Sequence, residues 1–197
     1  MRLVLASASP RRQELLNRLR LDFEIRPPDI DESRFPDEAP AAYVERVARS
    51  KAEAVAGEGL MVVAADTVVV HEGRIMGKPG HPEQARAMLR LLQGDVHEVF
   101  TGLAVASWDR GARVRSTVDM AEVEFLPMTE EEIVGYVDSG EPLDKAGGYA
   151  LQGLGGAFVS KVNGSPFTVV GVPIHLLARL VAASGGDIDA FRARVSG

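Results

Sequence analysis

The sequence predicts an α/β protein in which buried strands alternate with amphipathic helices. Apolar runs typical of strands occur at residues 2–6, 60–70 and 98–107. Residues 39–56 and 82–92 lie between these runs and carry apolar side chains at helical spacing. The 197 residues are enough for one good-sized α/β domain or for two small lobes that share a cleft.

The first strand leads into a helix through a turn that suits an anion. Ser9 is a natural N-cap, and Pro10 suits the first helical position. We expect two serine hydroxyls, two guanidinium groups and the N–H groups of the helix start to converge there. These side chains belong to Ser7, Ser9, Arg11 and Arg12. An ordinary capped surface helix with two solvated arginines is the alternative interpretation.

The remaining elements alternate in the same way. Further strands are expected at residues 23–26, 74–76 and 113–125. Further helices are expected at residues 129–138 and 173–183, followed by a short terminal helix. Turn signals stand at Gly57, Glu72-Gly73, Gly94, Asp109-Arg110-Gly111 and Gly185-Gly186. Thr129 and Glu132 form a capping box, and residues 140–171 are dense in glycine.

Composition excludes several classes of protein. The residues are 46% hydrophobic and 25% charged, as in an ordinary soluble globular protein. A net charge of -6 argues against a surface that coats nucleic acid, because such a surface must be basic. The absence of cysteine excludes disulfides, thiolate zinc sites and cysteine nucleophiles. Without a membrane-length apolar run or a signal-peptide pattern, we expect a cytoplasmic protein.

Asp66 interrupts the strongest apolar strand, in the sequence A-A-D-T, and stands beside Thr67. Carboxylates at strand ends of α/β sheets often face a ligand crevice. The alternative is an aspartate that serves a turn, but residues 68–70 continue as strand. We therefore expect Asp66 to be functional and to lie at the end of a strand.

Other carboxylates gather in the polar loop at residues 27–37. Asp29, Asp31 and Glu32 offer oxygen ligands of the kind that Mg²⁺ or Mn²⁺ accepts. A solvated acidic loop is the alternative. Taken by itself, this pattern favours the solvated loop.

Lysine is scarce, because only four of the 22 basic residues are lysine. A lysine is therefore expected where a compact point charge is needed. Lys51 lies on the second helix, while Lys78 and Lys145 adjoin glycine-containing turns. Such turns are typical of phosphate contacts and also of simple β-turns. Lys161 is expected to be an ordinary surface residue.

Familiar nucleotide-binding and hydrolase motifs are absent. The sequence contains no P-loop, no dinucleotide-binding glycine motif that joins a strand to a helix, and no G-x-S-x-G. What remains is an anion-binding helix start, a strand carboxylate, an acidic loop and three placed lysines. Those are the parts needed for metal-assisted hydrolysis of a nucleoside polyphosphate.

Eight motifs occur in order over nearly the whole chain: S-A-S-P-R-R-Q-E-L-L, D-I-D-E-S, A-R-S-K-A, A-A-D-T-V-V, G-K-P, H-E-V-F-T-G, D-K-A-G-G-Y-A-L-Q-G and V-V-G-V-P. Together they resemble the motifs of the Maf nucleoside triphosphate pyrophosphatases. The resemblance implies a single Maf-like domain over residues 1–197, with the inosine-triphosphatase-like α/β fold: two lobes, a twisted mixed β-sheet, flanking helices and an active cleft between the lobes. It also implies hydrolysis of a nucleoside triphosphate to the monophosphate and pyrophosphate, with Mg²⁺ or Mn²⁺, or Co²⁺ as a further candidate.

The resemblance also assigns site residues. Asp66 matches the general base, and Lys51 and Lys78 join it as catalytic groups; Glu32 and Asp66 are the metal carboxylates. The expected substrate-binding residues are Ser7, Ser9, Arg11, Arg12, Thr67, Asp144, Lys145 and Gln152. Arg11, Thr67 and Gln152 match the branch that acts on dTTP and UTP. The Gln152 amide can both donate and accept, as the O4 and N3–H edge of these bases requires.

A second function remains open at this point. The same resemblance allows a nucleotide-binding regulator of septum formation and cell division that binds nucleotide without significant turnover. In either case the expected partner is a small-molecule nucleoside triphosphate, while nucleic acids and membranes are not expected partners. A homodimer is left open.

Overall fold

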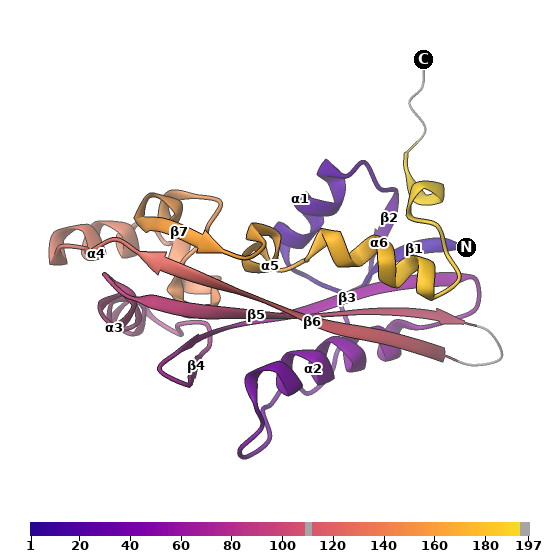
Figure 1. Cartoon of the computed structure of the whole chain (residues 1–197), viewed down its shortest axis with the longest axis horizontal. Coiled ribbons are helices and arrows are strands. Elements are labelled where there is room, and N and C mark those ends of the chain that lie inside the picture. Colours follow the sequence, from indigo (N-terminus) through magenta and orange to yellow (C-terminus); the bar gives the residue numbers. More distant parts are fainter. Residues whose placement is uncertain (109–111, 194–197) are drawn as a thin grey trace. The chain divides into compact units, whose positions relative to one another are not determined.

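The computed structural model describes residues 1–108 and 112–193, and their strands form one seven-stranded sheet (Figure 1). The strands are β1 (Arg2–Leu5), β2 (Phe23–Ile25), β3 (Leu60–His71), β4 (Arg74–Met76), β5 (Val96–Trp108), β6 (Ala112–Phe125) and β7 (Val159–Asn163). The α-helices are α1 (Pro10–Arg18), α2 (Pro40–Val55), α3 (Pro82–Leu92), α4 (Glu130–Asp138), α5 (Pro166–Val170) and α6 (Ile174–Ala183). Short 3₁₀ helices are η1 (Glu141–Asp144), η2 (Ala146–Gly148), η3 (Leu154–Phe158) and η4 (Ile188–Phe191).

The strand order is β2-β1-β3-β5-β6-β7, and β4 pairs with β3. β1 is parallel to β2 and to β3, whereas β3 with β4 and β6 with β7 are antiparallel. The predicted α/β class with a mixed sheet and flanking helices is therefore confirmed. The turn expected at residues 109–111 lies outside the described residues. Within the described residues, no helix combines the length and the apolar character needed to cross a membrane.

The chain divides into two compact units. Unit 1 comprises the described parts of Met1–Asp66, Thr101–Asp119 and Gly171–Gly197. Unit 2 comprises Thr67–Phe100 and Met120–Val170. Strands β3, β5 and β6 contribute residues to both units.

In unit 1, α2 lies on one face of the strands, with α1 and α6 on the other (Figure 1). Small side chains let α2 approach closely: Ala48 and Ala52 are buried with Ala64 and Ala104 in one apolar cluster. Contact is closest at Gly102 of β5, where a Cβ atom would overlap the backbone of Val44 on α2. This close approach sets α2 directly on the strands and so controls where its polar side chains reach.

The pairing of β1 with β3 ends where the first turn begins. Leu5 is opposite Val63, and the Ala6 N–H donates to the Val63 carbonyl at 2.8 Å before the chain leaves for α1. β3 continues past this point to His71 and pairs with β4. The prediction that Asp66 lies at a strand end is therefore wrong, because β4 extends the ladder that holds this strand. Asp66 instead lies three residues beyond the last pair of β1 with β3.

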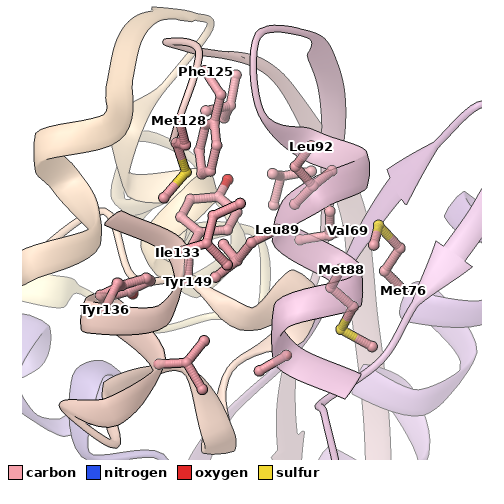
Figure 2. Close-up of a cluster of buried hydrophobic side chains, with 14 residues drawn as sticks. Val69, Met76, Met88, Leu89, Leu92, Phe125, Met128, Ile133, Tyr136 and Tyr149 are labelled. Atoms are coloured by element: carbon pink, nitrogen blue, oxygen red, sulfur yellow. The ribbon is translucent and has the colours of Figure 1, made fainter. Parts of the chain in front are cut away.

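Unit 2 is built around aromatic and apolar side chains. Figure 2 shows Phe125 and Tyr149 near Ile133 of α4 and Leu89 of α3. The rings of Phe125 and Tyr149 meet edge to face, with centroids 4.7 Å apart. The predicted capping box begins α4: the Thr129 side chain accepts from the Glu132 N–H, and Glu132 accepts from the Thr129 N–H.

The glycine-dense stretch forms more structure than its composition predicts. It contains η1, η2, η3, β7 and α5. β7 pairs with β6, with Val162 opposite Val123. Partners distant in sequence thus create these elements, which local pattern alone does not predict.

Candidate active site

A lysine lies between two carboxylates in unit 1. The Lys51 Nζ atom donates to Glu32 Oε2 and to Asp66 Oδ1, each at 2.8 Å. Lys51 is 6% exposed and Asp66 is 8% exposed, whereas the Glu32 side chain is 49% exposed. One ammonium group therefore joins a carboxylate of the sheet to a carboxylate of the acidic loop. Glu32 is thus exposed to solvent, as in a solvated loop, and is also paired with a buried lysine.

The elements of unit 1 explain why these three residues meet. Val62, Ala64 and Asp66 are alternate residues of β3 and so share one strand face. Val62 and Ala64 pack in the cluster that contains Ala52 of α2. Lys51, the residue before Ala52 and itself buried on α2, is thereby brought to Asp66. Thr67 follows Asp66 in the strand, so its side chain points to the opposite strand face.

The loop that carries Glu32 is held against α2. The Tyr43 hydroxyl donates to the Glu32 carbonyl at 2.9 Å. Arg46 donates to both oxygens of Glu38 at 2.6 and 2.8 Å and to the Ser33 carbonyl at 2.9 Å. Its guanidinium also lies 4.1 Å from the ring centre of Phe35. These contacts hold Glu32 and the residues that follow it, up to Glu38, against α2.

The first turn brings Ser7, Ser9 and Arg12 of the expected anion-binding residues together. Ser7 Oγ accepts from the Ser9 N–H and from Arg12 Nη1, each at 3.2 Å. Arg12 Nε donates to the Gly171 carbonyl at 3.1 Å. Ser9 occupies the N-cap position of α1 as predicted, although its side chain caps none of the described N–H groups. In this turn the Ser7 hydroxyl is the side-chain acceptor for the Ser9 N–H.

Arg12 is buried, at 9% exposure. Burial lowers its pKa, while the charges of Asp66 and Glu32 act in the opposite direction and that of Arg11 adds to the lowering. The guanidinium is thus close enough to both carboxylates, and to Arg11, for their charges to act on it. The interpretation of α1 as a surface helix with two solvated arginines is wrong for Arg12.

A phenol also borders the two carboxylates. Burial raises the pKa of Tyr43, and the charges of Asp66 and Glu32 raise it further. In the structure its ring is half-buried and its hydroxyl points to the acidic loop. Tyr43 therefore belongs to the surroundings of the site.

Glu32 and Asp66 provide a donor set that fits a divalent cation. Both reach the same Lys51 ammonium, so their oxygens can approach one positive charge from two sides. Mg²⁺ prefers oxygen ligands and is commonly held by one or two carboxylates together with substrate phosphates and water. Among the described residues, no group of three or more His, Asp or Glu side chains is arranged to hold a metal. Glu32 and Asp66 are therefore the carboxylates that could hold such a cation together with substrate phosphates.

The other expected site residues, catalytic Lys78 and substrate-binding Asp144, Lys145 and Gln152, lie in unit 2. Lys78 is exposed and follows Gly77, whose carbonyl accepts from the Gly147 N–H at 3.1 Å. Lys145, two residues before Gly147, pairs with Asp144 and donates to the Glu141 carbonyl at 3.0 Å. Gln152 is exposed in the glycine-rich loop. The segments that carry Lys78 and Lys145 are thus joined through backbone.

Sequence reasoning missed three residues that hold these segments in place. Tyr43 and Arg46 anchor the acidic loop, and Glu141 binds the loop that follows Gln152. Arg46 and Glu38 are eight residues apart, and Glu141 and Gly155 are 14 apart. Such separations exceed local helix or turn spacing, so no periodic signal marks them.

The chain is similar to known proteins over nearly its whole length. The family described as Maf-like protein matches residues 2–184. The chain is 52% identical to the dTTP/UTP pyrophosphatase of Anaeromyxobacter sp. (strain Fw109-5), covering 93% of this chain and 90% of that protein. It is 48% identical to the dTTP/UTP pyrophosphatase of Desulforamulus reducens, covering 94% and 98%. Among solved structures, the Staphylococcus aureus Ham1 protein has a TM-score of 0.49 at 15% identity, covering 93% and 99%. The family match and the two close relatives show that this chain belongs to the Maf family.

Proposed function

We propose that this protein is a nucleoside triphosphate pyrophosphatase that hydrolyses dTTP and UTP to the monophosphate and pyrophosphate. One observation carries the proposal: the chain is 52% identical, over 93% of its length, to a protein named dTTP/UTP pyrophosphatase. The arrangement of Glu32, Lys51 and Asp66 supplies groups that suit this reaction.

In the proposed reaction, Asp66 acts as the general base. Its carboxylate takes a proton from a water molecule whose oxygen forms a bond to the α-phosphorus. The bond from the α-phosphorus to the bridging oxygen of the β-phosphate breaks, and pyrophosphate leaves with the electron pair. Lys51 holds Asp66 Oδ1 at 2.8 Å and so fixes the orientation of the base.

Each unit also carries cations that are candidates for binding the polyphosphate. In unit 1 these are Arg11 and Arg12, and Ser7 can still donate its hydroxyl hydrogen because its accepted bonds use only lone pairs. Lys78 and Lys145 are the corresponding candidates in unit 2. Glu32 and Asp66 would hold Mg²⁺, Mn²⁺ or Co²⁺, which when bound neutralises charge on the phosphates and the leaving group.

Product analysis tests the reaction directly. Purified protein is incubated with dTTP or UTP and Mg²⁺ or Mn²⁺, and both pyrophosphate and orthophosphate are measured. We expect pyrophosphate and monophosphate in equal amounts. Orthophosphate with diphosphate would indicate cleavage between the β and γ phosphates. Nucleotide binding without any product would favour the regulator of cell division.

Base preference provides a separate prediction. We expect UTP and dTTP to be hydrolysed at least about tenfold more efficiently than ATP or GTP, since an unmatched amide hydrogen bond costs about 1 to 3 kcal/mol. Gln152→Glu is expected to reduce this ratio, because a carboxylate cannot donate to O4 of the base. The measurement is kcat/KM for the four nucleotides with both proteins. Equal values for ATP and UTP in the unmodified protein would refute the pyrimidine preference and leave the pyrophosphatase reaction intact.

The lysines of unit 2 offer a matched pair of substitutions. Lys78→Ala is expected to raise KM for UTP roughly tenfold or more, because it removes a cation that a protein with net charge -6 must supply locally. Lys161→Ala, on the exposed edge strand β7, is expected to change KM less than about twofold. Steady-state kinetics on both variants at fixed ionic strength makes the comparison. An equal effect of the two substitutions would remove Lys78 from the substrate site.

The proposed substrate also bears on partners and location. We propose that the partner is the small-molecule nucleotide itself, with neither nucleic acid nor membrane involved. A cytoplasmic location follows from this proposal, because nucleoside triphosphates are made and consumed there. Whether the protein forms a homodimer is an independent question for measurement of mass in solution.

A further inference from the structure

The loop that contains Gln152 is bound to a single carboxylate. Glu141 Oε2 accepts from the Leu154 N–H at 3.0 Å, and Glu141 Oε1 accepts from the Gly155 N–H at 3.0 Å. The Tyr136 hydroxyl donates to Glu141 Oε1 at 2.8 Å. Three donors therefore converge on one charged acceptor, which is an arrangement stronger than neutral hydrogen bonds.

Tyr136 extends this network to the other side of the loop. Its hydroxyl oxygen accepts from the Ala150 N–H at 3.2 Å, while its ring is buried and lies 5.4 Å from that of Phe158. Backbone groups two residues before and two residues after Gln152 are thus bound by the same pair of side chains. The position of Gln152 between them is restricted on both sides.

Glycines allow the loop to approach Glu141 and Tyr136 this closely. A Cβ atom at Gly153 would overlap the Glu141 carboxylate, and one at Gly155 would overlap the Tyr136 hydroxyl. Gly140, with φ of 77°, lies in the left-handed region and turns the chain after α4, so that Glu141 faces back to Tyr136. The glycines of this stretch therefore leave room for the Glu141 carboxylate beside the loop, in addition to forming turns.

Glu141 also connects the loop to a candidate phosphate ligand. Its main-chain carbonyl accepts from Lys145 Nζ at 3.0 Å. Burial raises the pKa of the Glu141 carboxyl, but the bonds from Gly155, Leu154 and Tyr136 and the charge of Lys145 lower it, and the net direction is downward. The carboxyl therefore stays ionised, as an acceptor-only group must be.

We propose that Glu141, with Tyr136, is a positioning residue for base selection, which holds the Gln152 loop in the conformation that distinguishes uracil and thymine from purines. This inference rests on the function proposed above. Glu141 acts through the loop and not on the nucleotide. Its removal should therefore change the ratio of affinities for different bases, which a purely structural role would leave constant.

The test compares the unmodified protein with Glu141→Gln, Tyr136→Phe and Glu131→Gln. Glu141→Gln keeps the shape of the side chain but turns one acceptor into a donor that faces an N–H group. Tyr136→Phe keeps the buried ring and removes only the hydroxyl. Glu131→Gln, an exposed residue of α4, is the control for loss of a negative charge. Thermal melting shows whether each variant is folded. If Glu141→Gln does not fold, the affinity test is made with Tyr136→Phe alone.

Two properties that do not depend on catalysis are measured: amide exchange in the loop and affinity for nucleotide analogues. Amide exchange at Leu154 and Gly155 is expected to accelerate at least about tenfold in Glu141→Gln, because local opening exposes these N–H groups. The ratio of affinities for α,β-methylene-UTP and α,β-methylene-ATP is expected to fall by about fivefold in Glu141→Gln and Tyr136→Phe, the effect of one lost hydrogen bond. Glu131→Gln is expected to match the unmodified protein in both.

The outcomes separate this inference from the proposed function. Unchanged exchange at Leu154 and Gly155, an unchanged affinity ratio, or equal affinity of the unmodified protein for the two analogues overturns the inference, whatever the catalytic activity. Release of pyrophosphate from UTP by the unmodified protein is assayed in parallel and tests the reaction alone. A protein that releases pyrophosphate but shows unchanged ratios in the variants retains its function and loses this role for Glu141.

Discussion

Purified Asp66→Asn protein is expected to bind UTP and to hydrolyse it at least about 100-fold more slowly, the scale of general acid-base catalysis. The amide cannot take a proton from water. It occupies nearly the same volume as the carboxylate, and its oxygen can still accept from Lys51, so the packing of β3 against α2 should survive. The loss is therefore expected mainly in kcat, measured by pyrophosphate release at saturating UTP and metal.

The matched control is Asp22→Asn, which removes one negative charge from an exposed position of unit 1. Its kcat is expected to stay within about twofold of the unmodified protein. Circular dichroism and thermal melting establish that both variants are folded. A folded Asp66→Asn protein with ordinary kcat would exclude Asp66 as the base and would direct attention to Glu32.

Asp66 also illustrates how much of the candidate site can be predicted from the sequence. Its polarity inside an apolar strand marks it for function, since a buried carboxylate costs free energy unless something pairs with it. Its partner is not marked in the same way. Lys51 is 15 residues away, on a helix whose distance from β3 is set by Gly102 and by small buried side chains such as Ala52 and Ala64. Periodicity predicts α2 but not which strand it contacts.

The fold shows the same division between local and long-range information. α3 begins and ends as predicted at Pro82 and Leu92, because proline and amphipathic spacing are local signals. The β3–β4 hairpin is equally local: Glu72 and Gly73 both have positive φ, at 48° and 74°, as its two-residue turn requires. β7 and the loop around Glu141 depend on partners far along the chain and so have no local signature.

Lys51→Met is expected to cause losses of both stability and activity. Methionine keeps an unbranched stem of similar length but removes the ammonium from between Glu32 Oε2 and Asp66 Oδ1. Removing one partner from a buried ion pair costs about 3 to 5 kcal/mol; we expect about 2 to 3 kcal/mol here, because half of the Glu32 side chain is exposed. Loss of a fixed cation at the reacting groups is expected to lower kcat/KM for UTP about 100-fold or more. Denaturant unfolding and pyrophosphate release measure the two effects.

The same variant tests whether Glu32 and Asp66 hold a divalent cation. Without Lys51, these carboxylates have lost the ammonium that neutralised them, and a cation that binds only the folded state raises its stability by mass action. Added Mg²⁺ is therefore expected to raise the melting temperature of Lys51→Met more than that of the unmodified protein. Lys161→Met, which changes an exposed lysine, should respond to Mg²⁺ as the unmodified protein does. Equal Mg²⁺ responses in all three proteins would show that the two carboxylates hold Lys51 alone, and the metal would then have to be bound by other groups.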